Sequence, residues 1–207
     1  MKKLLLLAVL ALPLAAQPRI VFTKTFTGSV PEFVEIVMER DGSTTYKEAD
    51  DETPVRFQLK QAQADEIFSL AEKLDKFQKQ LESGLKGANM GKKTFRWMDG
   101  AAKKGEAAYN YSLDTNAQAL QEWFEKIIET ESHFVNLELA ARFDKLGVNK
   151  VILLFNASYD RGRIVAPEQF LPLLDRIEKN SSYLNMDRER ASNLAKAIRN
   201  PPAPTQP

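Results

Sequence analysis

An alternating stretch between residues 33 and 46 constrains the fold more than any other part of this chain. Its apolar side chains occupy every second position, which is the period of a β-strand with one buried face: Val34, Ile36 and Met38. Asp41-Gly42 follows, and this dipeptide between two alternating runs indicates a β-hairpin. A strand pair with one apolar face must be covered, so the rest of the chain has to supply a second layer.

The hairpin permits two registers that differ by one residue. A two-residue turn at Asp41-Gly42 pairs Tyr46 with Val37, whereas a three-residue loop that also includes Arg40 pairs Tyr46 with Ile36. A slip of one residue exchanges the two faces of a strand. We predict the three-residue loop, with its glycine left-handed as a G1 bulge, because this register puts the tyrosine on the apolar face of the first strand.

The first 16 residues have the pattern of a secretory signal. A basic start, Met1-Lys2-Lys3, precedes an apolar run at residues 4–14 and the small residues Ala15-Ala16. The run is too short to span a bilayer, and no later stretch approaches the roughly 20 apolar residues that a membrane helix needs. We therefore predict cleavage after Ala16 and a soluble mature protein that is periplasmic or secreted.

Composition excludes several classes of function. The chain contains no cysteine, which rules out disulfides, thiol catalysis and thiolate metal sites, and export without disulfides favours a bacterial origin. A formal net charge of +1 gives no global attraction to nucleic acid or to a membrane. Acidic residues gather at 32–52 and basic ones at 86–104, and we predict a solvated, mutually compensating surface; a partner-binding patch is the alternative. The basic residues are Lys86, Lys92, Lys93, Arg96, Lys103 and Lys104.

Three further segments have the pattern of strands. Residues 19–27 alternate and are rich in β-branched side chains, and residues 55–59 form a short alternating run after a turn-rich loop. Residues 94–98 begin a second predicted hairpin, which turns between Asp99 and Gly105 and returns through residues 106–113. Its inward side chains would be Phe95, Trp97, Ala107, Tyr109, Tyr111 and Leu113. Such aromatics could also stack single-stranded nucleic acid, but export and the neutral charge favour core packing and no nucleic-acid partner.

Helical periodicity dominates the remainder. We predict a helix over 61–83 that ends at Gly84 and covers the hairpin, and a second that starts with a capping box at Thr115. Polar residues at 129–133 predict a break or domain boundary, after which the helical pattern resumes up to Leu146. The apolar run at 151–155 fits strand or helix, and we choose helix because its neighbours are helical.

The last part of the chain is also predicted to be helical. Pro167 sits where a helix begins, with Pro172 in its first turns, and residues 186–199 form a final amphipathic helix. The predicted fold class is therefore α+β: an antiparallel sheet of two hairpins packed by helices, followed by an all-helical C-terminal region. We divide the chain into a leader at 1–16, an α+β domain at 17–130, a helical region at 131–199 and a disordered Pro-rich tail at 200–207.

Short motifs over residues 20–130 resemble a family of small secreted bacterial domains of unknown function. The motifs are residues 28–33 (Gly-Ser-Val-Pro-Glu-Phe), then Asp41-Gly42 and Tyr46, followed by a helix and a second hairpin. In that family cysteines often flank the glycine, and here Phe26 and Val30 occupy those places. The family has no established activity, so the resemblance implies a fold and an exported location and no chemistry.

Catalytic and metal-binding patterns are scarce. Residues 84–93 superficially resemble a phosphate-binding loop, but three residues instead of four separate Gly87 from Gly91, and Lys93 stands where a P-loop has Ser or Thr. We therefore predict a mobile connection there. A single histidine also excludes a two-histidine metal site. We predict no cofactor and no metal.

The best candidate site is the pair Glu129 and His133, which are four residues apart and share a helix face. Glu131 and Ser132 lie between them. Ser132 cannot use the adjacent histidine as its base, because consecutive helical side chains diverge by about 100°. The alternative for this pair is a solvated helix face without a function.

The sequence therefore favours an exported, non-enzymatic binding or interaction module, whose partner could be an envelope or secreted protein. A hydrolase with a dispersed carboxylate site is the alternative, since carboxylates from distant segments could converge on a cleft. An exposed apolar patch would favour the first reading, and a deep pocket ringed by acids would favour the second.

Overall fold

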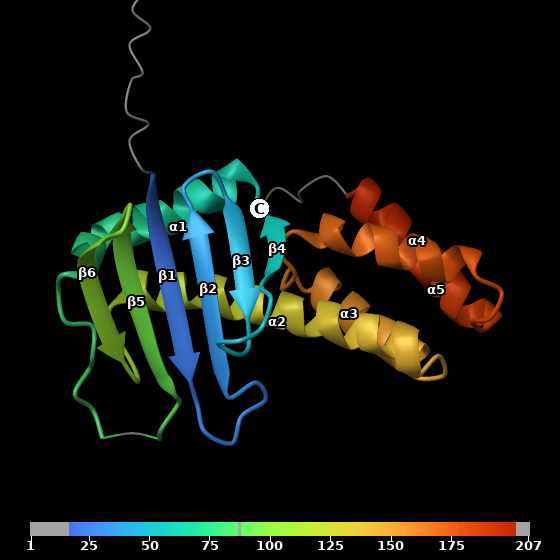
Figure 1. Cartoon of the computed structure of the whole chain (residues 1–207), viewed down its shortest axis with the longest axis horizontal. Coiled ribbons are helices and arrows are strands. Elements are labelled where there is room, and N and C mark those ends of the chain that lie inside the picture. Colours follow the sequence, from blue (N-terminus) through green and yellow to red (C-terminus); the bar gives the residue numbers. More distant parts are fainter. Residues whose placement is uncertain (1–16, 87, 202–207) are drawn as a thin grey trace, which may run out of the picture.

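The structure is a computed structural model that describes residues 17–86 and 88–201. The predicted leader, Gly87 and residues 202–207 of the predicted tail lie outside the described residues. Within the described range, the chain forms one six-stranded antiparallel sheet and five α-helices, and most of the helices belong to the C-terminal half (Figure 1). The predicted α+β class is confirmed.

The first strand lies at the centre of the sheet, between the two hairpins. β1 pairs with β2 on one side and with β5 on the other, which gives the strand order β4-β3-β2-β1-β5-β6. The strands are β1 (Pro18–Thr25), β2 (Phe33–Glu39), β3 (Ser43–Lys47), β4 (Val55–Gln58), β5 (Lys92–Asp99) and β6 (Ala102–Tyr109). Strands β1 to β4 form a meander, and β1 joins this meander to the second hairpin.

The opening hairpin has the three-residue loop. Ile36 lies opposite Tyr46, and Gly42 is left-handed with a φ of 84°. The alternative two-residue turn is therefore wrong. A Cβ on Gly42 would come within 2.7 Å of the carbonyl oxygen of Leu59, so close packing against the chain after β4 also requires a glycine here.

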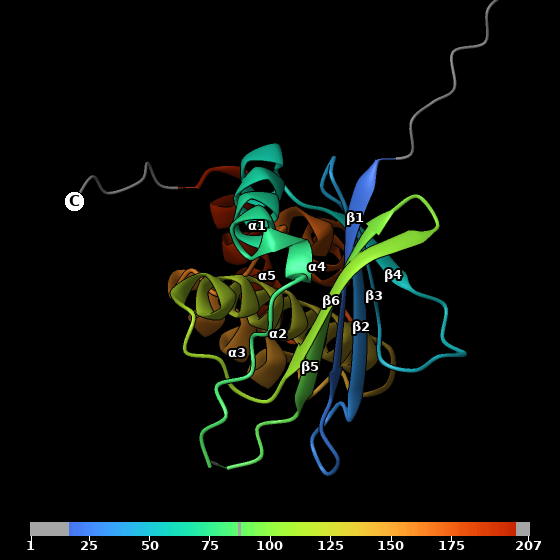
Figure 2. The same ribbon diagram turned by 90° about the vertical axis from the view of Figure 1, so that its left-hand side faces the viewer.

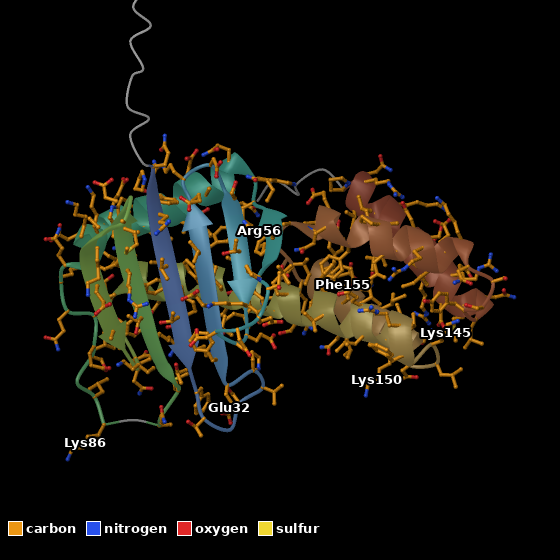
Figure 3. All side chains as sticks on the ribbon, in the orientation of Figure 1. Glu32, Arg56, Lys86, Lys145, Lys150 and Phe155 are labelled. Atoms are coloured by element: carbon orange, nitrogen blue, oxygen red, sulfur yellow. The ribbon has the colours of Figure 1, made fainter. Side chains whose placement is uncertain are left out.

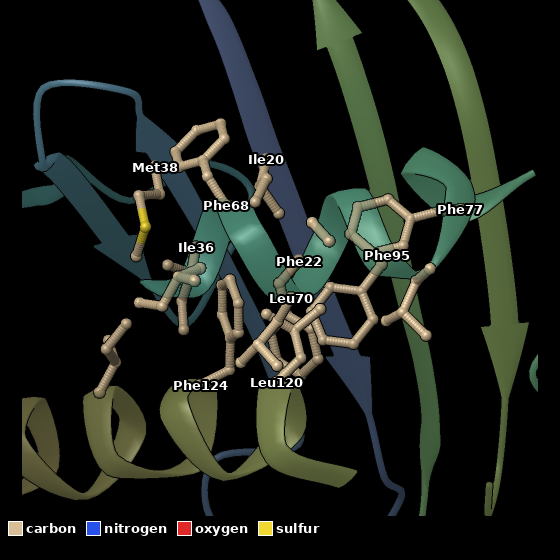
Figure 4. Close-up of a cluster of buried hydrophobic side chains, with 14 of the residues drawn as sticks. Ile20, Phe22, Ile36, Met38, Phe68, Leu70, Phe77, Phe95, Leu120 and Phe124 are labelled. Atoms are coloured by element: carbon tan, nitrogen blue, oxygen red, sulfur yellow. The ribbon is translucent and has the colours of Figure 1, made fainter. Parts of the chain in front are cut away.

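Two helices cover the apolar face of the sheet. α1 (Gln61–Lys73) and the first half of α2 (Thr115–Phe143) lie on the same side of the strands (Figure 2). Aromatic rings join the layers, since the Phe22 ring lies 4.9 Å from that of Phe95 and 4.8 Å from that of Phe124. Figure 4 shows this sheet core, which includes Ile20, Phe22, Ile36, Met38, Phe68, Leu70, Phe77, Phe95, Leu120 and Phe124.

The helix predicted over residues 61–83 is longer than the observed helix α1. α1 ends at Lys73, and the next residues form a short 3-10 segment, η1 (Asp75–Phe77), in which all three residues have positive φ. The left-handed turn stacks the Phe77 ring on Phe95 at 5.2 Å. The predicted apolar stripe is nevertheless buried, because Leu81 also reaches the core from non-helical chain. Tertiary packing therefore ends the helix before Gly84.

The second hairpin also differs from its prediction. β6 begins at Ala102, after a tight turn at left-handed Gly100, and ends at Tyr109, so Tyr111 and Leu113 are exposed instead of inward. The chain leaves the hairpin after Tyr109 because the next backbone groups form hydrogen bonds with Glu82 and Ser83 instead of with β5. Glu82 accepts from the backbone N–H of Asn110 at 2.6 Å, and the N–H of Ser83 donates to the carbonyl of Tyr111 at 2.9 Å.

α2 is continuous over 29 residues, so the helix break predicted at 129–133 is wrong. Its N-cap is Asp114 and not Thr115, because the Asp114 carboxylate accepts from the backbone N–H groups of Asn116 and Ala117. The polar residues at 129–133 include buried Thr130 and Glu131. Their polarity reflects hydrogen bonds to other segments and does not mark the end of a helix.

The second half of α2 belongs to a helical core beyond the sheet. The apolar run at 151–155 is helical, as predicted, and the predicted helix starts at Pro167 and near residue 186 are confirmed. The elements are α3 (Val148–Asp160), η2 (Pro167–Phe170), α4 (Leu171–Lys179) and α5 (Asn185–Arg199). Among the described residues no helix has both the length and the apolarity to cross a bilayer.

Candidate functional site

The predicted pair on α2 meets a third residue that the sequence analysis did not include. Ser158 of α3 donates its hydroxyl proton to Glu129 Oε1 at 2.7 Å, and His133 Nε2 lies 3.0 Å from the same Oγ. The two residues of the candidate site are therefore joined through a serine from the neighbouring helix. The pair Glu129 and His133 does not lie on a solvent-exposed helix face, because Ser158 is buried and His133 is partly buried.

An arginine from the segment after α3 completes the cluster. Arg163 Nε donates to Glu129 Oε2 at 2.8 Å, and its guanidinium also forms an ion pair with Glu122 two turns earlier on α2. Burial raises the pKa of Glu129, but the hydrogen bonds from Ser158 and Arg163 outweigh burial and hold this pKa below its ordinary value. Glu129 is therefore an ionised carboxylate that only accepts hydrogen bonds.

The ionised carboxylate fixes the direction of the other bonds. The single hydroxyl proton of Ser158 points to Glu129, so the bond between Ser158 and His133 requires His133 to donate from Nε2. Burial lowers the pKa of His133, although Glu129 opposes this shift, so the imidazole is neutral with its proton on Nε2 at neutral pH.

This polarity is the opposite of a catalytic triad. In a triad the Nε2 lone pair accepts the serine proton, and a carboxylate holds the other ring nitrogen. Here Nε2 already carries a proton, and the carboxylate binds the serine instead of the histidine. The cluster therefore acts as a clamp that joins α2, α3 and the segment at 161–166, and it does not activate a nucleophile in this arrangement.

Metal binding finds no support in the described part of the chain. No group of three or more His, Asp or Glu side chains has a geometry that could hold an ion there. The paired carboxylates of the sequence, Asp50-Asp51 and Asp65-Glu66, are exposed in a loop and on the first turns of α1. Glu66 accepts from the indole N–H of Trp123 at 3.1 Å, which is a contact between helices.

Ser158 and Arg163 were not predicted, because they lie 25 to 41 residues from their partners in the sequence. One signal could have found the serine. Ile152 and Phe155 define the buried face of α3, and Ser158 continues that face at helical spacing. A polar residue on an apolar face needs a polar partner.

A polar groove of about 330 Å³ lies beside the first turns of α2, where β5 begins and β6 ends. Its two carboxylates are paired, Glu125 with Lys24 at 3.0 Å and Glu122 with Arg163. The groove is lined by Met90, Lys93, Tyr111, Ser112, Gln118, Gln121, Glu122 and Glu125. It therefore offers amides and hydroxyls but no unpaired carboxylate.

Lys93 is buried at the floor of this region, which corrects its prediction as a solvated basic residue. Its ammonium donates to the carbonyl oxygens of Asn110 at 2.8 Å, Met90 at 3.3 Å and Gly91 at 3.5 Å. Burial lowers the pKa of Lys93, against an opposing effect of Glu125. The ammonium fixes the loop before β5 to the chain after β6, so the predicted mobile connection is anchored at this end.

A group of exposed apolar side chains lies at the other end of the molecule. Phe143 is 76% exposed and Leu146 is 78% exposed, at the turn between α2 and α3. Leu184 and Met186, at the turn between α4 and α5, are each about half exposed. We call these four residues the distal tip. They contribute little to the helical core, which is built by other residues of the same helices.

Comparisons with protein-family models, with curated proteins and with solved structures give no match to this chain. The resemblance of residues 20–130 to secreted bacterial domains therefore stays a prediction.

Proposed function

We propose that this chain is an exported, non-enzymatic binding module that contacts its partner through the distal tip. The exposure of Phe143 and Leu146 carries the proposal, because large apolar side chains gathered on a surface favour an interaction site. The leader pattern at residues 1–16 supports export to a periplasmic or extracellular location.

The candidate cluster supports a structural role over a catalytic one. Its serine donates to Glu129, its histidine is a donor at Nε2, and Arg163 neutralises the carboxylate. The hydrolase alternative needs one acid and one base with separated pKa values that face a shared cavity. The two acids of the polar groove, Glu122 and Glu125, are ion-paired with Arg163 and Lys24 instead.

Photo-crosslinking in living bacterial cells tests the proposal. A photoreactive amino acid replaces Leu146 at the distal tip or, as a matched control, Leu85, which is also exposed but lies beyond η1 in the sheet half. We expect mass-shifted products from position 146 and none above background from position 85. Equal products from both positions would exclude the distal tip as the binding surface.

A second measurement addresses catalysis directly. The chain from Gln17 onward is incubated with generic ester, glycoside and phosphate substrates, together with the Glu129→Gln variant. We expect no turnover above the buffer rate from either protein. Turnover that depends on Glu129 would replace the proposal with the hydrolase alternative.

A further inference from the structure

We propose that the partner of the distal tip is an anionic lipid surface, which rests on the proposed function and names its ligand. The first supporting observation is the arrangement of the two turns. Lys145 Nζ of the α2–α3 turn donates to Ser182 Oγ of the α4–α5 turn at 2.9 Å, and the Tyr183 hydroxyl donates to the carbonyl of Ala141 at 2.8 Å. These bonds hold both turns side by side at the end of the molecule farthest from β6 (Figure 1).

The two turns thus present their apolar side chains at one end of the molecule. Phe143, Leu146, Leu184 and Met186 come from this end of four helices or their connections. Complete burial of one such side chain is worth roughly a tenfold to hundredfold change in affinity. A fluid interface can surround exposed side chains without a preformed pocket, so the tip suits a bilayer surface.

Charge supplies the second observation. Residues 142–150 and 179–188 contain five basic residues and two acidic ones. The basic residues are Arg142, Lys145, Lys150, Lys179 and Arg188. Figure 3 shows Lys145 near this end of the helical half and Lys150 farther back along it. Because the whole chain has a formal net charge of only +1, the positive charge at the tip is a local concentration.

Of the two acidic residues in the same segments, Asp187 is withdrawn from the surface and Asp144 is exposed. Asp187 is fully buried and accepts from the side-chain amide of Asn149 at 2.8 Å. The Asp144 carboxylate accepts from the backbone N–H of Gly147 at 3.0 Å, inside its own turn. Three further acids border these segments: half-buried Glu178 precedes Lys179, exposed Glu189 follows Arg188, and exposed Glu138 lies one turn before Arg142. The two segments therefore expose or half-expose five basic side chains and one acidic one, Asp144.

A basic and apolar surface selects among possible partners. Each lysine or arginine near an anionic leaflet contributes roughly a fivefold increase in binding, and exposed apolar side chains enter the boundary between headgroups and acyl chains. A second copy of the chain fits less well. A two-fold interface through the tip would set the same basic side chains against one another.

Vesicle co-sedimentation tests the inference. The chain from Gln17, which contains every described element, is mixed with vesicles of phosphatidylcholine alone or with one third phosphatidylglycerol. We expect at least tenfold tighter binding to the anionic vesicles, and weaker binding as salt is raised. The Phe143→Ser/Leu146→Ser variant should bind at least tenfold more weakly. The Lys145→Gln/Lys150→Gln variant should lose binding to anionic vesicles only.

The matched control is Leu85→Ser/Leu113→Ser, which removes two exposed apolar side chains from the sheet half. Its vesicle binding should stay within twofold of the unchanged chain, and all variants should keep the same thermal midpoint. Equal binding to both lipid compositions, or no loss in the tip variant, would overturn the inference. Light scattering that detects a dimer lost in the tip variant would assign the tip to self-association. If the chain does not bind vesicles but position 146 still crosslinks to a protein, the proposed function survives and the lipid assignment is wrong. If the chain neither binds vesicles nor crosslinks from position 146, the proposed function and the lipid assignment are both wrong.

Discussion

Glu131 of α2 accepts a 2.9 Å hydrogen bond from the side-chain amide of Gln169 in η2, and its other carboxylate oxygen has no hydrogen-bond partner in the described part of the chain. The residue lies on α2 between the sheet core and the helical core and is fully buried. Burial raises its pKa to about 7, although the bond from Gln169 opposes the shift. An acid of this kind makes stability depend on pH near neutrality.

The Glu131→Gln variant should be more stable than the unchanged chain at pH 8. A carboxyl with a higher pKa in the folded than in the unfolded state stabilises the fold below about pH 4.5, and this contribution is lost as the pH rises through about 7. The full shift corresponds to on the order of 3 kcal/mol. Urea unfolding at pH 5 and pH 8 measures the difference, which should be largest at pH 8. Glu138→Gln, on an exposed part of α2, is the control and should leave the pH dependence unchanged.

The Glu129→Gln variant should lower the pKa of His133 below its value in the unchanged chain. The negative charge of Glu129 opposes the effect of burial on this imidazole, so its removal leaves burial unopposed. His133 is the only histidine, so its ring protons give a single titration curve by NMR. The same spectra should place the proton on Nε2 near neutral pH. A raised midpoint, or a proton on Nδ1, would contradict the direction of the bonds with Ser158.

Replacement of Lys93 by Met should destabilise the protein by on the order of 2–3 kcal/mol, because one buried and two part-buried hydrogen bonds from its ammonium to carbonyl oxygens are lost. Lys92→Met is a close control, since Lys92 is the exposed neighbour in the same strand. Denaturant unfolding gives the two free energies, and hydrogen exchange should show faster opening around Asn110 only in the first variant. Equal effects of both substitutions would mean that the ammonium does not hold this loop.

The Gly105→Ala variant should be destabilised by on the order of 3 kcal/mol. A Cβ on Gly105 would overlap the carbonyl oxygen of Lys76, so β6 and the left-handed turn η1 could not both keep their positions. Ala108→Ser adds an atom to an exposed residue of the same strand and should change the unfolding free energy by less than about 0.5 kcal/mol. Thermal and urea unfolding compare the two, and a similar small effect at Gly105 would mean that η1 moves freely.

Local pattern was sufficient where each residue depended on its neighbours in the chain. The period of two in β2, together with Gly42, gave the register that pairs Ile36 with Tyr46. The same kind of reasoning identified the helical run that became α3. It extended α1 by about ten residues, because periodicity continued through Phe77 and Leu81 while the backbone left the helix. The apolar periodicity therefore predicted which side chains are buried, but it did not predict where the helix ends.

The candidate site was likewise predicted only in part from local pattern. Spacing placed Glu129 and His133 on one face of a helix, but the hydroxyl that joins them belongs to a helix about 25 residues away. Polar residues at 129–133 indicated a break because their partners were unknown. Once Gln169 and Ser158 are present, polarity in the middle of α2 satisfies buried groups and the helix continues.

The amino-acid sequence by itself determined the class of this protein: which segments are strands or helices, which side chains are apolar, and which chemistries it lacks for want of cysteine and a second histidine. Those properties follow from local periodicity and residue type. The tertiary structure alone decided that β1 joins the two hairpins, that Lys93 and Glu131 are buried, and that Phe143 and Leu146 are exposed. Each of these depends on contacts between distant segments, and helical periodicity cannot tell an apolar side chain that packs in a core from one that the fold leaves at its surface.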